Sequence, residues 1–241
     1  MIMIEIIDFH SHVLPGIDDG SDSVEQSIEM LQMEAEQGIQ HVVATPHFYP
    51  KHHMPEDFLR SRAEAESVLR TEMAKNEGMP HLSVGAEIYF FSGIANSEVL
   101  QQLTIDKKRC IILEMPPYPW TESMYKEMED IVIKQGITPV IAHIDRYIRP
   151  FGTHGIPERL AELPVLVQAN ASFFLKASTR RLALRLLRED KIHLIGSDCH
   201  NISMRKPNMG QAIATIENRL GAEALERIQS YQQMLLTEEL L

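Results

Sequence analysis

The feature that most constrains this chain is a series of short apolar runs that end in histidine, aspartate or glutamate. The first run, 2–7, leads into Asp8-Phe9-His10-Ser11-His12. In a β-strand, residues two apart point to the same face, so His10 and His12 can place two imidazoles in one cavity. Neutral imidazoles bind Zn, Mn or Fe. One such pair alone is more often an ordinary surface or core feature, but the pattern recurs along the chain.

The apolar runs alternate with helical patterns along the chain. We expect strands at 2–7, 39–44, 82–87, 111–115, 138–142, 165–169 and 192–197. We expect helices at about 22–37, 56–76, 97–103, 122–135, 156–163 and 179–189. Strands that are each followed by a helix, without an internal linker, predict an α/β fold with one parallel barrel as a single domain over residues 1–241. The apolar segment Leu220 to Leu241 is expected to pack on this barrel or on another subunit.

A doubly wound open sheet is the alternative architecture. Such sheets usually carry a glycine-rich, phosphate-binding turn directly after the first strand. The segment Gly16-Ile17-Asp18-Asp19-Gly20 does not match that turn. The barrel is therefore favoured.

Composition indicates a soluble protein of the cytoplasm. The chain has 241 residues, 44% of them hydrophobic, which is enough for a sizeable core. Two cysteines, Cys110 and Cys199, are too few for a disulfide framework and suggest a reducing compartment. We find neither a signal peptide nor an apolar run long enough for membrane insertion. The net charge of −11 argues against a nucleic-acid partner.

The ends of the predicted strands carry the residues with chemical potential. In parallel barrels the active site lies at the carboxyl ends of the strands. The candidates at these ends and in the adjoining loops are His10, His12, Asp18, Asp19, His47, Glu87, Glu114, His143, Asn170, Asp198 and His200. Each alone has an ordinary explanation, as a salt-bridged carboxylate or a core histidine. Coincidence at six strand ends is unexpected, since barrel strands carry mainly Ile, Val and Leu.

This concentration of acids and imidazoles predicts a polynuclear metal site. Buried carboxylates repel one another unless cations neutralise them. The candidate ligands outnumber the four to six positions of one ion, so two or three ions bridged by a carboxylate fit better. A mixture of imidazole and carboxylate favours Mn, Fe or Zn over Ca or Mg. Such clusters acidify a bridging water and bind the oxygens of a phosphate ester.

The motifs as a set resemble those of the PHP superfamily, named for polymerase and histidinol phosphatase. They read Asp-Phe-His-Ser-His, Ala-Thr-Pro-His, Gly-Ala-Glu-Ile, Ile-Ala-His-Ile-Asp-Arg-Tyr and Ser-Asp-Cys-His. Within it, segments 14–20 and 139–143 are most similar to the bacterial metal-dependent tyrosine phosphatases of capsule and exopolysaccharide synthesis. The resemblance extends from residue 8 to the neighbourhood of residue 210. It implies the PHP fold, a distorted seven-stranded (β/α) barrel of TIM type.

The resemblance also implies a centre of three divalent metal ions, often Mn2+, with Fe or Zn as alternatives. The implied ligands are His10, His12, Glu87 and Asp198 for one ion, Glu87, Glu114 and His143 for a second, and Asp19, His47 and His200 for the third. Asp18 stays an alternative to Asp19. Arg146 and Arg205 match the family's phosphate-binding positions and are the expected catalytic and substrate-binding residues. Asp145, where the family often has Glu, and the imperfect match of 203–207 are departures from its pattern.

The implied function is that of a protein-tyrosine phosphatase. Its expected substrate is a phosphotyrosine-bearing, autophosphorylating bacterial tyrosine kinase that regulates capsule or exopolysaccharide synthesis. Rival interpretations are a phosphoesterase of a small phosphomonoester such as histidinol phosphate, and a non-catalytic, metal-stabilised barrel that binds a kinase tail or a nucleotide. Aromatic residues at 89–91 and in the loop 115–120 either form a wall for a phenyl ring or simply pack on the barrel.

A thiolate mechanism is a further alternative, because Cys199 and Arg205 have the Cys-x5-Arg spacing of cysteine-dependent tyrosine phosphatases. Those loops usually need glycine to wrap phosphate, and residues 200–204 contain none. We therefore expect Cys199 to be dispensable.

Overall fold

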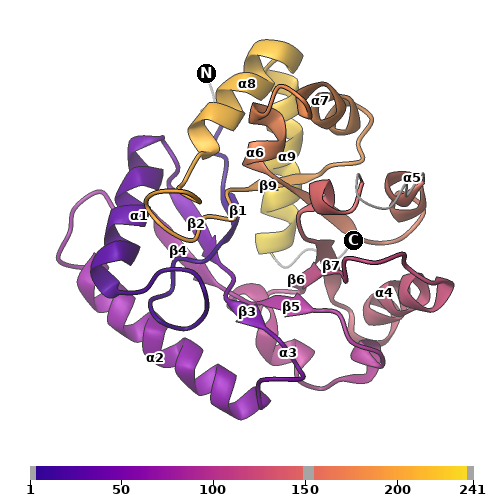
Figure 1. The fold of residues 1–241 in the computed structure, drawn as a ribbon, viewed down its shortest axis with the longest axis horizontal. Coiled ribbons are helices and arrows are strands. Elements are labelled where there is room, and N and C mark those ends of the chain that lie inside the picture. The colour runs from indigo at the N-terminus through magenta and orange to yellow at the C-terminus, as the bar shows by residue number, and fades with distance from the viewer. Residues whose placement is uncertain (1–3, 149–154, 238–241) are drawn as a thin grey trace.

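Parallel strands occupy the middle of the molecule, and helices surround them (Figure 1). The computed structural model describes residues 4–148 and 155–237. The strands are β1 (Asp8–Ser11), β2 (His41–Ala44), β3 (His47–Phe48), β4 (His81–Val84), β5 (Glu87–Tyr89), β6 (Cys110–Glu114), β7 (Thr138–Ile141), β8 (Leu166–Asn170) and β9 (Leu194–Gly196). They pair in the orders β1-β2-β4 and β3-β5-β6-β7-β8-β9.

Two of the strands are interrupted near their carboxyl ends. Thr45 and Pro46 separate β2 from β3, and Gly85 and Ala86 separate β4 from β5. Pro46 lacks the N–H that a strand donates to its neighbour. Gly85 passes so close to the next segment that a Cβ there would lie 2.7 Å from Cγ1 of Ile105. Counted as continuous, the strands of the described residues number seven, as the sequence predicted.

Contacts between β1 and β9 close the ring of strands. Ser11 and Cys199 form a parallel bridge, and the backbone N–H of His12 donates to the carbonyl of Cys199 at 2.9 Å. The N–H of Asp198 donates to the carbonyl of His10 at 2.8 Å. The predicted α/β barrel is therefore confirmed, with its closure at the two strands that carry the His-x-His and Asp-Cys-His motifs.

The helices form an outer ring around these strands (Figure 1). They are α1 (Val24–Glu36), α2 (Pro55–Met73), α3 (Leu100–Leu103), α4 (Glu122–Gln135), α5 (Ile156–Leu160), α6 (Ala171–Leu175), α7 (Arg180–Arg188), α8 (Met209–Leu220) and α9 (Ala222–Leu236). None of the helices in the described part of the chain combines the length and the apolarity that a membrane crossing requires.

The inward-facing side chains of the strands form an apolar core and become polar at the carboxyl ends of the strands. One cluster of buried residues consists mainly of inward-facing strand side chains, namely Phe9, Val43, Ile112, Val140, Leu166 and Leu194. Two residues further along their strands come Glu114 and Gln168, and Asn170 follows two beyond Gln168. Because residues two apart share a face, the same side of the sheet that builds the core ends in polar groups.

The first strand begins later than predicted. The sequence placed it at 2–7, but β1 begins at Asp8, and the described residues before it are not in the sheet. The backbone N–H of Ile7 donates to Oε1 of Gln232 at 3.0 Å, and Nε2 of Gln232 donates to the carbonyl of Ile7 at 2.8 Å. Hydrogen bonds to α9 thus replace strand pairing in this segment.

Several helices end short of their predicted bounds, and α2 ends at Met73 instead of 76. The segment 97–103 contains only the single turn α3, and α5 ends at Leu160 instead of 163. At the C-terminus, α9 packs on the barrel, where Ile228 and Leu235 are buried. Residues 238–241 of the predicted packing segment lie outside the described residues.

Candidate metal centre

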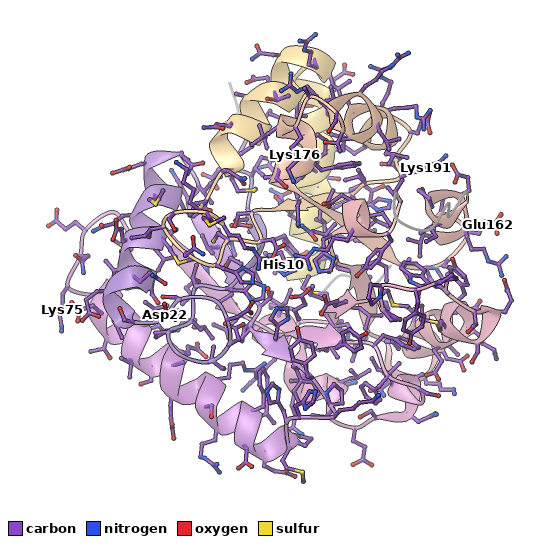
Figure 2. All side chains as sticks on the ribbon, in the orientation of Figure 1. His10, Asp22, Lys75, Glu162, Lys176 and Lys191 are labelled. Atoms are coloured by element: carbon purple, nitrogen blue, oxygen red, sulfur yellow. The ribbon has the colours of Figure 1, made fainter. Side chains whose placement is uncertain are left out.

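The carboxylate of Glu87 lies at the centre of a cluster of imidazoles. Its Oε2 is 3.2 Å from Nε2 of His10, 3.3 Å from Nε2 of His12 and 3.0 Å from Nδ1 of His47. Its Oε1 is 2.6 Å from Nε2 of His143. Figure 2 shows His10 near the middle of the molecule, where the strands meet. Four histidines from three strand ends therefore face one buried carboxylate.

Asp198 is a second carboxylate of the cluster, on the β9 side. Its Oδ1 lies 3.5 Å from Nε2 of His12 and 3.7 Å from Nδ1 of His200. Asp198 has φ of 53°, a left-handed conformation that few residues other than glycine adopt. His143, which also belongs to the cluster, has φ of 32°. Strained backbone at two chemically important positions is typical of a functional site.

Glu114 and Asp19 lie at the rim and are joined through His47. Its Nδ1 is 3.9 Å from Oε2 of Glu114, and its Nε2 is 3.5 Å from Oδ1 of Asp19. Glu114 also approaches His143, at 3.7 Å, and Asp19 approaches His200, at 3.6 Å. The nine residues that the sequence singled out as ligands thus lie in one network of contacts.

Neighbouring oxygens determine which nitrogen of His12 and of His200 faces the cluster. Nδ1 of His12 lies 2.8 Å from Oδ2 of Asp18, which leaves Nε2 directed at Glu87. Nδ1 of His200 is 3.0 Å from the carbonyl of Asp198, which leaves Nε2 directed at Asp19. Histidines that bind metals are typically held in this way by a carboxylate or carbonyl on the second nitrogen.

Burial and charge oppose each other at the central carboxylates. Burial disfavours the ionised form of Glu87 most strongly, but the positive charges of His10 and His143 outweigh it and hold the pKa well below the usual range. Burial likewise opposes ionisation of Asp198, whose pKa is still held well below the usual range by a hydrogen bond from His12 and the charge of His10. The cluster therefore requires positive charge to keep its acids ionised.

The donor atoms of the cluster fit divalent cations. Oε2 of Glu87, Oε2 of Glu114, Nδ1 of His47 and Nε2 of His200 are buried without a hydrogen-bond partner. Three groups of residues place one donor atom each within 4.8 Å of one another: His12, His47 and His200; His10, His12 and Asp198; and His47, Glu87 and Glu114. These carboxylate oxygens and imidazole nitrogens are buried, face one another and lack hydrogen-bond partners. A cation bound between them would satisfy both kinds of atom.

Two arginines reach the cluster from the loops after β7 and β9. One guanidinium nitrogen of Arg146 pairs with Oδ2 of Asp198, and the other lies 3.6 Å from Oε1 of Glu114. Arg205 lies 2.9 Å from Oδ1 of Asp198. Both arginines also line a polar cavity of about 510 Å³ beside the cluster. Two forked cations next to clustered ligands can bind the oxygens of a phosphoryl group.

Comparison with known proteins places the chain in a family. A family model described as "Capsular polysaccharide synthesis, CpsB/CapC" matches residues 6–237. The chain belongs to the CpsB/CapC family. The resemblance drawn from the motifs is thereby confirmed.

Relatives of this family match almost the whole chain. The tyrosine-protein phosphatase YwqE of Bacillus subtilis is 28% identical over 239 residues, which cover 97% of this chain and 92% of that protein. The tyrosine-protein phosphatase CpsB of Streptococcus agalactiae is 25% identical over 233 residues, with coverage of 92% and 94%. A solved structure from work on YwqE and the Streptococcus pneumoniae CpsB, described as unique metal-dependent tyrosine phosphatases, is similar with a TM-score of 0.87. It is 26% identical and covers 98% of this chain and 96% of that chain.

The structure excludes Cys199 as a nucleophile in this CpsB/CapC family member. The thiol is fully buried and lies with Asp8 and Glu34. Burial, and then the charges of Asp8 and Glu34, raise the pKa of the thiol well above its usual range. A buried thiol with a raised pKa supplies no thiolate, so the Cys-x5-Arg spacing is coincidental here.

Gln168 is a positioning residue that the sequence interpretation missed. Its Oε1 accepts a hydrogen bond from the backbone N–H of His143 at 2.6 Å and lies 3.4 Å from Nδ1 of His10. Its Nε2 donates to Oδ1 of Asn170, whose Nδ2 donates to Oδ2 of Asp198. The available signal was a glutamine inside an apolar strand, two residues before Asn170 and therefore on its face.

Two glycines allow the His-x-His segment of this family member to sit where it does. A Cβ at Gly196 would lie 2.6 Å from Cβ of His10, and a Cβ at Gly20 would lie 2.4 Å from the carbonyl oxygen of His12. Neither position has room for a side chain. These contacts hold the segment against β9 on one side and the 16–20 loop on the other.

Proposed function

We propose that the chain is a metal-dependent protein-tyrosine phosphatase. Its substrate is phosphotyrosine on an autophosphorylating bacterial kinase that regulates capsule or exopolysaccharide synthesis, and it acts in the cytoplasm as one phosphoesterase barrel over residues 1–241. The observation that carries the proposal is the carboxylate of Glu87 among four imidazoles, with Arg146 and Arg205 beside it. Its curated relatives YwqE and CpsB are tyrosine phosphatases, which supports the choice of reaction.

The ligand set we propose holds three divalent ions, Mn2+ in preference to Fe or Zn. The assignment is His10, His12, Glu87 and Asp198 for the first, Glu87, Glu114 and His143 for the second, and Asp19, His47 and His200 for the third. Asp19 is preferred to Asp18, because both oxygens of Asp18 already accept hydrogen bonds from the protein. When bound, such ions polarise phosphoryl oxygens and lower the pKa of water.

The chain's own contribution to the reaction is to hold and orient the phosphoryl group. Arg146 and Arg205 pair with Asp198 and face the polar cavity beside it, so a phosphoryl group entering there meets both guanidinium forks. These cations stabilise the negative charge that builds on the nonbridging oxygens in the transition state. Phenolate is a good leaving group, so the demand on a general acid is small.

Two rival functions make different predictions. A phosphoesterase of small molecules would prefer histidinol phosphate to a phosphotyrosine peptide, and a binding module would release no phosphate from either. The arginines beside the ligand cluster favour turnover, because a module that only binds needs no water-activating centre.

The decisive experiment combines elemental analysis with a phosphatase assay. Freshly purified protein is analysed for Mn, Fe and Zn, and then assayed on a phosphotyrosine peptide and on histidinol phosphate. We expect three ions per chain, preference for the peptide, loss of activity in chelator and recovery with Mn2+. Full activity after complete chelation, or a preference for histidinol phosphate, would overturn the proposal.

A further inference from the structure

A groove lined by aromatic side chains adjoins the candidate metal centre. The cavity has a volume of about 740 Å³ and lies between the segments that follow β3, β5 and β6 and the start of α4. Its aromatic lining comprises Tyr49, Tyr89, Phe90, Phe91 and Tyr118. We call it the aromatic groove.

Contacts between rings connect this groove to the cluster. The ring of Tyr49 stacks on that of His47, with centroids 5.0 Å apart and an interplanar angle of 27°. The ring centroid of Tyr89 lies 5.7 Å from that of Tyr49. The inner end of the groove is therefore continuous with the site of the chemistry.

The outer end of the groove is open to a partner. Tyr118 is 56% exposed there, one of few large apolar side chains of the described residues that are this accessible. An exposed aromatic residue that continues a half-buried aromatic wall is more typical of a binding surface than of a core. Tyr and Phe supply large contact areas with little loss of conformational freedom, which is why they are common in binding sites.

The groove is large enough to hold more than one aromatic ring. Cavities of 300–1,000 Å³ accommodate ligands of drug size, and this one lies near the upper part of that range. The polar cavity beside Arg146 and Arg205, by contrast, includes Lys176 and Lys206 and lies on the β8 and β9 side. The aromatic groove also has Lys51 and Glu127 in its lining, but it lies on the β3, β5 and β6 side of the barrel.

We propose that the aromatic groove binds the apolar or aromatic side chains that neighbour the phosphotyrosine in a polypeptide substrate. This inference rests on the proposed function and adds a sequence preference to it. The inner end receives the phosphorylated ring, which Tyr49 and Tyr89 flank, and the outer end receives a neighbouring side chain against Tyr118. Selection by these contacts would favour a protein substrate over a small phosphomonoester.

The test compares phosphotyrosine peptides that differ only in the flanking residues, which are alanine, leucine, phenylalanine or glutamate. We expect kcat/KM to be about 10-fold higher with phenylalanine than with alanine, mainly through a lower KM, because each aromatic contact contributes up to about 10-fold. In Tyr118→Ala this ratio falls toward one, and in Tyr118→Phe it is kept. Ile133→Ala removes an exposed apolar side chain that lies on α4 outside the groove, and it should leave the ratio unchanged.

The possible outcomes distinguish a failure of the groove proposal from a failure of the proposed phosphatase function. Equal hydrolysis of all four peptides, or a preference that survives in Tyr118→Ala, overturns the groove alone. A preference for glutamate would show that charge, and not aromatic contact, selects the flanking residue, and also overturns it. Refusal of every peptide overturns the proposed function and the groove together.

Discussion

The carboxylate of Asp18 lies 2.8 Å from Nδ1 of His12 and holds that ring with Nε2 directed at Glu87. The same Oδ2 accepts the backbone N–H of His47 at 2.9 Å, so one carboxylate positions two members of the cluster. Its pKa is lowered to about 2, because the hydrogen bond and the charge of His12 outweigh the effect of burial. Asp18 is therefore ionised at any pH at which the protein would work.

Asp18→Asn keeps the shape of this side chain and removes its charge. We expect the affinity for Mn2+ to fall about 10- to 100-fold, because ligand basicity depends on the partner of the second ring nitrogen. Calorimetric titration of chelator-treated protein with Mn2+ measures this change. Asp22→Asn, in the same loop region, is the control and should bind Mn2+ as the unaltered protein does. Unchanged affinity in Asp18→Asn would show that the contact does not tune the site.

Glu87→Gln replaces the central carboxylate by an isosteric amide. Because Glu87 faces four imidazoles, the loss of its charge removes the proposed bridge between ions. We expect elemental analysis to find fewer bound ions. We also expect kcat to fall more than about 100-fold, because losing a ligand costs more than losing a residue that only orients one. Glu122→Gln, an exposed change at the start of α4, should alter neither quantity. Normal turnover by Glu87→Gln would contradict the ligand assignment.

Arg146→Lys and Arg205→Lys keep positive charge but remove the fork that can bind two oxygens. We expect kcat/KM for a phosphotyrosine peptide to fall about 100-fold in each, in the range found when a transition-state donor is removed. Metal content should stay unchanged, since neither arginine is a ligand. Arg185→Lys on α7 is exposed and serves as the control. If either variant lost metal together with activity, that arginine would support the metal site and would not act by binding phosphate.

Glu34→Gln should change how stability depends on pH. Glu34 is buried on α1, and burial, with the charge of Asp8, raises its pKa well above 4.5. Above pH 4.5 the unfolded chain has released this proton while the folded protein still holds it, so stability falls as pH rises toward the raised pKa. The slope reaches about 1.4 kcal/mol per pH unit in that window. Glu34→Gln should abolish this component.

Urea unfolding of chelator-treated protein between pH 5 and pH 9 checks this expectation. Glu36→Gln, exposed on the same helix, is the control and should retain the slope of the unaltered protein. Parallel stability profiles for Glu34→Gln and the unaltered protein would mean that Glu34 ionises normally.

Cys199→Ala separates the metal mechanism from the thiolate mechanism. Because the thiol is fully buried beside Asp8 and Glu34, we expect kcat to change less than about twofold and only a modest loss of stability. Turnover of p-nitrophenyl phosphate in Cys199→Ala, with and without chelator, measures both effects. Activity that vanishes in this variant but survives chelation would restore the cysteine mechanism.

The sequence alone determined the order of the strands and the chemistry at their ends, though not where β1 begins. The period of two along a strand places Glu114 on the face of Ile112, and parallel strands end at one rim, so the positions of His143 and Asp198 followed from their places after apolar runs. The fold prediction needed only the alternation of strands and helices. These properties are local, and a single chain segment is enough to specify them.

Only the tertiary structure decided which distant residues meet. The start of β1 depends on Gln232 of α9, the orientation of His10 on Gln168 of β8, and the burial of Cys199 on its contact with Glu34 of α1. The aromatic groove likewise joins three segments that the sequence separates. Such contacts arise from packing between elements far apart in the chain, and residue spacing carries no record of which elements become neighbours.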